Sequence, residues 1–168
     1  AVEADEQKNE DLLSLANTRA RLRMVTLYYY AACKRYLVAG TGNKVEDFGV
    51  GFYTKYGDGG VDLSPIADLS KTQVRALAST LGVDQKILNA PPTDGLWDDG
   101  RNDEEQLDAT YEQLEWAMTQ HAAGKSPADF VGENARVFEV FLSHHNANNH
   151  KMEPIPCLLY TSDAADEV

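Results

Sequence analysis

The sequence predicts an α/β protein, and the order of its apolar segments is the reason. Apolar side chains recur at helical spacing from Asp11 to about Lys34, which predicts an amphipathic helix. The apolar run 36–39 follows and is stopped by Gly40, as is typical of a buried parallel strand. A second helix is indicated at 71–81, and helices that alternate with a strand are typical of α/β folds. Because one strand cannot form a sheet, the other strands are expected upstream of this sequence.

Short elements joined by turns are expected between these two helices. Residues 41–44 are predicted to form the exit loop of the strand, and residues 45–52 a short helix. Residues 56–60 are dense in turn formers, and 61–66 indicate a short extended segment broken by Pro65. The apolar face of the first helix is expected to consist of Leu15, Leu22, Val25 and Tyr29.

The remainder of the chain is predicted to be helical around one long loop. Ser70 is a favourable N-cap for the helix 71–81, and Gly82 is typical of a helix end. Residues 89–101, rich in Pro, Gly and Asp, indicate a long surface loop. Further helices are expected from 102 or 103 to about 120, and from about 132 to 145. The apolar stripe of the helix 71–81 is expected to consist of Val74, Leu77 and Leu81.

Composition excludes several classes of function. The formal net charge of -12 argues against nucleic-acid binding, which requires a cationic face. Cys33 and Cys157 are not in a paired pattern, so neither a disulfide framework nor a zinc site is indicated. His145 and His150 could suggest a zinc site, but the sequence has no third zinc ligand at a suitable spacing from them. Any anionic substrate must therefore be held by the few Lys and Arg side chains or by a metal ion.

The ends of the sequence also carry expectations. The acidic start is unlike a signal peptide and no apolar run is long enough to span a membrane, so a cytoplasmic protein is expected. Residues 1–156 are expected to be the C-terminal part of a single domain. Residues 157–168 match the translation of a transposase sequencing adapter, although a natural flexible tail is the alternative. No function is assigned to that tail.

The segment from Gly40 to Lys71, GTGNKVEDFGVGFYTKYGDGGVDLSPIADLSK, carries a family resemblance. Four further motifs occur in the same order as in that family, NTRARLRM at 17–24, PPTDGLWDDGR at 91–101, YEQLEWAM at 111–118 and HNANNHKMEPIP at 145–156. Together they resemble the ammonia-dependent NAD synthetases over about residues 15–156.

This resemblance implies a fold and a reaction. The fold is a Rossmann-like parallel sheet flanked by helices, of the adenine nucleotide alpha hydrolase or ATP-pyrophosphatase type, incomplete at the N-terminus. The reaction is the amidation of deamido-NAD by ammonia, with ATP as co-substrate and Mg²⁺ as cofactor. It passes through an adenylate and gives NAD, AMP and pyrophosphate. The resemblance also implies a homodimer, and it identifies no catalytic side chain in this sequence.

The resemblance assigns the ATP and metal contacts to particular residues. Thr41, Lys71 and Thr93 correspond to ATP-binding positions, and Glu46 to a ligand of Mg²⁺. Carboxylate oxygen suits this hard cation. Taken alone, a threonine at the position of Thr41 more often belongs to a plain loop, and a glutamate at the position of Glu46 is usually a partner of the helix dipole. Lys71 is placed where a helix dipole disfavours a cation unless an anion lies nearby, although a solvated lysine is the alternative.

Deamido-NAD contacts are assigned by the same resemblance. They fall on Arg21, Lys55, Asp62, His150 and Lys151. The glycine-rich turn near Lys55 allows close approach of a ligand, but it is also typical of a simple tight turn. The acidic loop that contains Asp94, Asp98 and Asp99 is expected to shield the reacting carboxylate from water, or else to be a solvated loop.

One part of the family pattern is missing from this sequence. The Ser-Gly-Gly-x-Asp-Ser loop that binds pyrophosphate and supplies a second carboxylate to Mg²⁺ does not occur. We therefore expect the chain by itself to be inactive. Two alternatives stay open, namely the synthetase portion of a glutamine-dependent enzyme and a non-catalytic nucleotide-binding fragment. A different ligase of the same superfamily is disfavoured because the HKMEPIP and TKYGDGG segments match the NAD synthetases.

Overall fold

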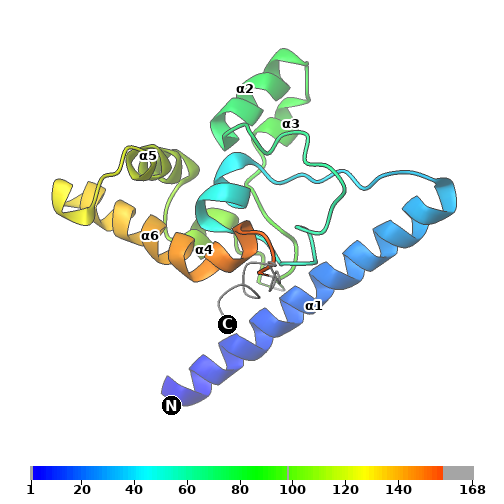
Figure 1. The fold of residues 1–168 in the computed structure, drawn as a ribbon, viewed down its shortest axis with the longest axis horizontal. Helices are drawn as coiled ribbons and strands as arrows, with labels where there is room; N and C mark the ends of the chain where they lie inside the picture. The colour runs from blue at the N-terminus through cyan, green and yellow to red at the C-terminus, as the bar shows by residue number, and fades with distance from the viewer. Residues whose placement is uncertain (1, 98, 157–168) are drawn as a thin grey trace, which may run out of the picture.

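The computed structural model describes residues 2–97 and 99–156, and for 2–10 the backbone alone. Figure 1 shows a long helix, α1 (Val2–Lys34), along one side of the molecule, with α5 and α6 side by side away from it. The helices α2 and α3 lie at the top of Figure 1, and α4 lies near its centre. In chain order, the elements after α1 are the π-helix η1 (Val45–Val50), α2 (Lys71–Thr80), α3 (Gln85–Leu88), α4 (Asp103–Leu107), α5 (Tyr111–Ala122), the 3₁₀ turn η2 (Pro127–Asp129) and α6 (Glu133–Met152).

The hydrophobic core is built by η1, α4, α5 and α6. Tyr111 and Leu114 of α5 and Phe138 and Phe141 of α6 are fully buried, and Val45 of η1 is 1% exposed. The ring centres of Phe138 and Phe130 lie 5.0 Å apart, and the partly buried Phe130 packs against the core. Residues from four separate segments thus share one apolar interior, and this interior fixes η1 against α5 and α6.

The parallel sheet expected from the sequence is not present in the described residues. Its expected strand, 36–39, makes a single parallel bridge between Ala39 and Leu63. Tyr36 and Leu37 are 72% and 69% exposed, because within the described chain no element covers these side chains. The segment 61–66 is confirmed as extended only at this bridge, where the Gly40 N–H donates to the Leu63 carbonyl at 2.7 Å.

The first helix is confirmed, but its expected buried face is wrong. Leu15, Leu22, Val25 and Tyr29 are 44–65% exposed, while the buried residues of α1 are alanines. Small side chains let the loops at 51–60 and 93–97 approach the helix closely, as the Cβ of Ala20 shows by its contact near Gly57. The large apolar side chains therefore face away from the rest of the described chain.

The stripe predicted for α2 is also exposed. Ser70 caps α2 by accepting from the Gln73 N–H, and Gly82 follows the helix with a φ of 75°, as the sequence predicts. No side chain of α2 is buried, and Leu77 and Leu81 are 45% and 73% exposed. The short helix α3, which follows directly, was not expected.

The expected C-terminal helices have different bounds in the structure. The single helix from 102 to about 120 is two helices, because Asp108 adopts a left-handed conformation (φ 53°) and Thr110 starts α5 with a new capping box. The last helix extends to Met152 instead of ending near 145. The long loop is confirmed between α3 and α4, with residue 98 outside the described chain. The tail 157–168, including Cys157, also lies outside it. None of the described helices is long and apolar enough to cross a membrane.

The core gives a test of the fold. Phe138→Ala is expected to lower the free energy of unfolding by about 3–5 kcal/mol, because it removes a fully buried ring and leaves a cavity. Val131→Ala, at a position that is 87% exposed, is the control and should change stability by less than about 0.5 kcal/mol. Urea denaturation followed by circular dichroism measures both, and equal effects would contradict the position of the core.

Candidate functional site

The site begins at the turn into η1, where a buried side chain organises the backbone. Asn43 is 2% exposed, and its amide oxygen accepts from the N–H groups of Val45 and Glu46 at 3.0 and 3.2 Å. Asparagine is favourable at the start of a helix for this reason. The turn places Glu46 in the first turn of η1, with its side chain directed toward α2 and α5.

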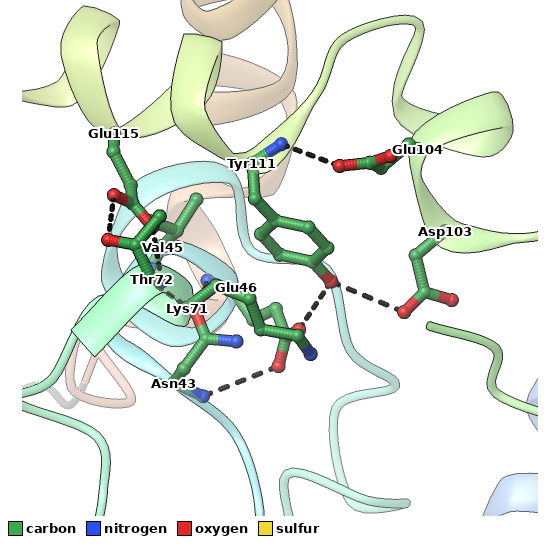
Figure 2. Close-up of polar contacts among 9 residues, drawn as sticks. All are labelled: Asn43, Val45, Glu46, Lys71, Thr72, Asp103, Glu104, Tyr111 and Glu115. Carbon is green, nitrogen blue, oxygen red and sulfur yellow. Dashed lines mark hydrogen bonds and ion pairs between the residues drawn. The ribbon is translucent and has the colours of Figure 1, made fainter. Parts of the chain in front are cut away.

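Glu46 is the centre of a polar cluster (Figure 2). Its Oε1 accepts a hydrogen bond from the Tyr111 hydroxyl at 2.5 Å and lies 3.2 Å from Nζ of Lys71. The Tyr111 hydroxyl also lies 3.2 Å from Oδ2 of Asp103, and the Lys71 ammonium lies 4.7 Å from the centre of the Tyr111 ring. The structure thus joins two of the predicted site residues, Glu46 and Lys71, into an ion pair.

Lys71 owes its place to the start of α2. Ser70 and Gln73 form a capping box there, and Glu115 of α5 accepts from both the N–H and the hydroxyl of Thr72, at 2.9 and 2.6 Å. These contacts hold the first turn of α2 beside η1. The anion that the sequence analysis required near a cation at this helix start is therefore Glu46.

Two adjoining cavities surround this cluster. The larger, about 580 Å³, is lined by Thr41, Glu46, Lys71 and Thr93 among others. The smaller, about 380 Å³, includes Lys55 in its wall. Both share Thr41, Glu46 and Lys151. Six of the nine predicted site residues therefore lie along one continuous recess.

Lys55 and Lys151 both lie where the end of α6 contacts the 51–60 turn. The Lys151 ammonium donates to the carbonyls of Gly51 and Tyr53, at 2.9 and 2.8 Å. Its burial lowers the pKa of Lys151, and the charge of Asp58 partly opposes this. The Lys55 ammonium donates to the His150 carbonyl at 2.5 Å.

The other three predicted residues do not line the recess. The His150 side chain is exposed and contributes its backbone carbonyl to the Lys55 contact. Arg21 is exposed, with its Nε 3.3 Å from the carbonyl of Lys55. Asp62 accepts from the Val38 N–H at 2.7 Å and from the Tyr28 hydroxyl at 3.1 Å, so it ties the extended segments 36–40 and 61–64 to each other and to α1.

The long loop is held against α1 by two arginines of that helix, Arg19 and Arg23. Arg23 donates to the carbonyls of Asp94 and Gly95 at 3.1 and 3.0 Å, and Arg19 donates to that of Leu96 at 2.6 Å. The loop consequently forms one wall of the larger cavity, to which Thr93 and Asp94 contribute. Asp98 is outside the described residues, and Asp99 pairs with Arg101.

Carboxylates dominate the electrostatics of the recess. Burial raises the pKa of Asp47 to about 6, and the charges of Glu46 and Asp58 add to the effect. Burial likewise raises the pKa of Asp58 and of Asp103, although hydrogen bonds to the Asp58 carboxylate oppose the shift. An anionic ligand therefore needs a cation to accompany it into this recess.

The donor atoms around Glu46 fit a magnesium ion that arrives with phosphate groups. No group of three or more His, Cys, Asp or Glu in the described residues can hold a metal by itself. Mg²⁺ is commonly bound through one or two carboxylates together with substrate phosphates. Within the described chain, Glu46 Oε2 accepts one long contact, from the Asn43 N–H at 3.3 Å, and so keeps capacity for a cation.

Sequence reasoning missed Asn43, Asp103 and Tyr111. Asn43 could have been found as a capping residue, since it stands just before the predicted helix at 45–52. Asp103 is 7% exposed with Oδ1 unpaired among the described residues, and nothing in its local pattern distinguishes it from an ordinary first-turn acid. The aromatic ring of Tyr111 suggests a core residue, and no sequence pattern predicts that its hydroxyl group reaches Glu46.

Two solved synthetases are similar to this chain in fold. The NMN synthetase from Francisella tularensis matches with a TM-score of 0.74 and 33% identity, covering 94% of this chain and 63% of that one. An NH3-dependent NAD synthetase from Campylobacter jejuni matches with a TM-score of 0.65 and 25% identity, over 88% of this chain and 56% of that one.

The sequence comparison is more specific. The profile of the NAD synthase family matches residues 1–155, and the chain belongs to this family. The NH(3)-dependent NAD(+) synthetase of Carboxydothermus hydrogenoformans is 47% identical over 119 residues, 71% of this chain and 48% of that protein. That of Methanocaldococcus jannaschii is 39% identical over 151 residues, 87% of this chain and 58% of that protein. The chain thus spans about half the length of these relatives.

The raised pKa of Asp47 gives a pH test. Below pH 3.8, the ordinary pKa, the Asp47 carboxyl is neutral in both the folded and the unfolded state. As pH rises from 3.8 to about 6, the free energy of unfolding falls, because the folded state must then hold a half-buried charge. Asp47→Asn should therefore stabilise the chain relative to the unmodified protein by an amount that grows from about pH 4 to pH 6 and is constant above. Urea denaturation across this range measures the difference, and a pH-independent difference would contradict the assigned shift.

Proposed function

We propose that this chain supplies the ATP-, metal- and dinucleotide-binding half of an enzyme that amidates deamido-NAD with ammonia. The enzyme uses ATP and Mg²⁺, passes through an adenylate, and releases NAD, AMP and pyrophosphate in the cytoplasm. The observation that carries the proposal is the common recess. Thr41, Glu46, Lys71 and Thr93 come from four separate segments and line one cavity, which opens beside that of Lys55.

In this proposal the larger cavity binds the nucleotide. Thr41 and Thr93 offer hydroxyl groups from two separate segments, and Lys71 offers a positive charge to phosphate oxygens. Bound Mg²⁺ supplies charge neutralisation for the phosphates, and Glu46 is the carboxylate that holds it. Lys71 then exchanges its contact with Glu46 for one with phosphate.

Deamido-NAD is proposed to occupy the smaller cavity. Lys55 and Lys151 lie in its wall beside the aromatic rings of Tyr53 and Tyr56. Arg21, Asp62 and His150 remain predictions from the family resemblance, since their side chains lie outside both cavities. The nicotinate carboxylate must reach the nucleotide where the cavities meet, near Thr41 and Glu46.

Water must be kept from the adenylate, because hydrolysis competes with ammonia. The loop held by Arg19 and Arg23 supports this role, since it walls the larger cavity between α1 and α4. Trp97 of the same loop stacks on Arg101 at 4.2 Å and adds an apolar surface to the wall.

Assembly as a homodimer is part of the proposal. Leu22, Val25 and Tyr29 of α1 are 62%, 57% and 65% exposed, and a contiguous apolar face of this kind on one helix is typical of a protein interface. A second copy of the chain covers it in a symmetric pair.

The mononucleotide NMN is a second candidate product, favoured by the match to the solved NMN synthetase. The two candidates differ in the acid that is amidated. Competition between deamido-NAD and its mononucleotide counterpart for the 168-residue chain distinguishes them, because the adenylate half of the dinucleotide adds contacts that the mononucleotide lacks.

Glu46→Gln tests the metal assignment. The amide preserves the side-chain volume and removes the charge, so Mg²⁺ should no longer strengthen ATP binding, a loss of at least about tenfold for a charged contact. Isothermal titration with ATP, with and without Mg²⁺, measures the effect. Glu112→Gln, an exposed position on α5, is the control. If ATP binding by Glu46→Gln still depends on Mg²⁺ as in the unmodified chain, Glu46 is not the ligand of the metal.

Val25→Glu tests the dimer. A charge in the apolar face of α1 should shift the chain from dimer to monomer in sedimentation velocity, because burying it in the interface is unfavourable. Leu81→Glu, a change at a 73% exposed residue just after α2, should leave the dimer intact. A monomeric unmodified chain, or a dimer that tolerates Val25→Glu, would refute the interface.

A further inference from the structure

We propose that α5 is the positioning element of this site, with Tyr111 orienting Glu46 and Glu115 placing Lys71 through the first turn of α2. This inference rests on the proposed function, since it concerns the residues assigned there to Mg²⁺ and ATP. Tyr111 and Glu115 are four residues apart on one helix and therefore project from the same face.

Tyr111 combines a core ring with a polar tip. The residue is fully buried, and its ring packs with Leu107, Leu114 and Phe138 in the same cluster. Its hydroxyl leaves this apolar cluster and reaches Glu46 Oε1 at 2.5 Å and Asp103 Oδ2 at 3.2 Å. A phenylalanine would fill the same core volume, so packing does not explain the hydroxyl group.

The hydrogen bond determines which oxygen of Glu46 stays available. Tyr111 and Lys71 both engage Oε1, whereas Oε2 has a single long contact to the Asn43 N–H in the described chain. The terminal torsion of a glutamate is otherwise broad and nearly two-fold. By fixing that torsion, Tyr111 keeps Oε2 available for a cation.

Glu115 acts on the other half of the ion pair. Both of its oxygens are used by Thr72, one by the N–H at 2.9 Å and one by the hydroxyl at 2.6 Å (Figure 2). A carboxylate at a helix N-terminus satisfies unpaired N–H groups and is favoured by the helix dipole. Because α2 buries none of its own side chains, this contact has a large share in fixing α2 and therefore Lys71.

Loss of the Tyr111 contact and loss of the Glu115 contact should have different effects on ligand binding. This difference distinguishes a positioning role from a general loss of stability. Tyr111→Phe should raise the Mg²⁺ concentration needed to strengthen ATP binding by about tenfold, the size expected for a hydrogen bond to a charged group. Its affinity for ATP without metal should be unchanged. Glu115→Ala should weaken metal-free ATP binding by about three- to tenfold and leave the magnesium requirement unchanged.

The experiment is isothermal titration of the 168-residue chain with ATP, first with a chelator and then at increasing Mg²⁺. Glu112→Ala is the matched control, because Glu112 is an exposed glutamate between Tyr111 and Glu115. Its contact with α2 is an exposed ion pair with Arg75 at 3.7 Å, which contributes little, so this change should alter neither quantity. Circular dichroism confirms that each variant is folded. Combining Tyr111→Phe with Glu46→Gln should add no further loss, because the hydroxyl acts through that carboxylate.

The outcomes separate this inference from the proposed function. If the unmodified chain shows no magnesium-dependent ATP binding, the proposed function and the inference both fail. If Mg²⁺ strengthens binding in a Glu46-dependent way but Tyr111→Phe and Glu115→Ala behave like Glu112→Ala, the inference alone is overturned. An additive loss in the double variant also overturns it, since Tyr111 would then act independently of Glu46.

Discussion

A carboxylate that is largely removed from water requires donors or a cation, and the side chain of Glu46 is 14% exposed. Its partners come from three different elements. Lys71 belongs to α2, Tyr111 to α5, and Asn43 to the turn before η1. Satisfying this one charge therefore brings together segments that are distant in sequence, and the cavities form around their meeting point. Removing a partner leaves an uncompensated charge at the place where the ligand is proposed to bind.

The net charge of the whole chain also requires a cation at this site. A protein with net charge -12 that is proposed to bind a triphosphate must overcome repulsion from its own carboxylates. Asp47, Asp58 and Asp103 lie around the recess with raised pKa values, and the cations in its walls include Lys55, Lys71 and Lys151. In the proposed function, a divalent ion that binds together with the nucleotide resolves this conflict, because it neutralises phosphate and carboxylate together.

The sequence could predict local structure well where a capping or turn residue decides it. Ser70 and Gly82 mark the ends of α2, and the loop 89–101 follows from its composition. Burial was harder to predict. Helical periodicity identifies an apolar face but not what covers it, so Leu22 and Leu77 were expected inside and are exposed. Motif resemblance selected Glu46 and Lys71 as candidate site residues, whereas the contact of Glu46 with Tyr111 depends on tertiary packing between residues 65 positions apart.

Arg19 and Arg23 bind the long loop through carbonyl oxygens of residues 94–96. A carbonyl is present whatever the side chain, so this recognition depends on the path of the backbone and not on residue identity. Substitutions at Asp94 or Leu96 that keep the turn leave the attachment intact. The wall of the cavity can therefore change its chemical character through mutation while the loop keeps its position, which makes this segment a natural place for substrate preference to diversify.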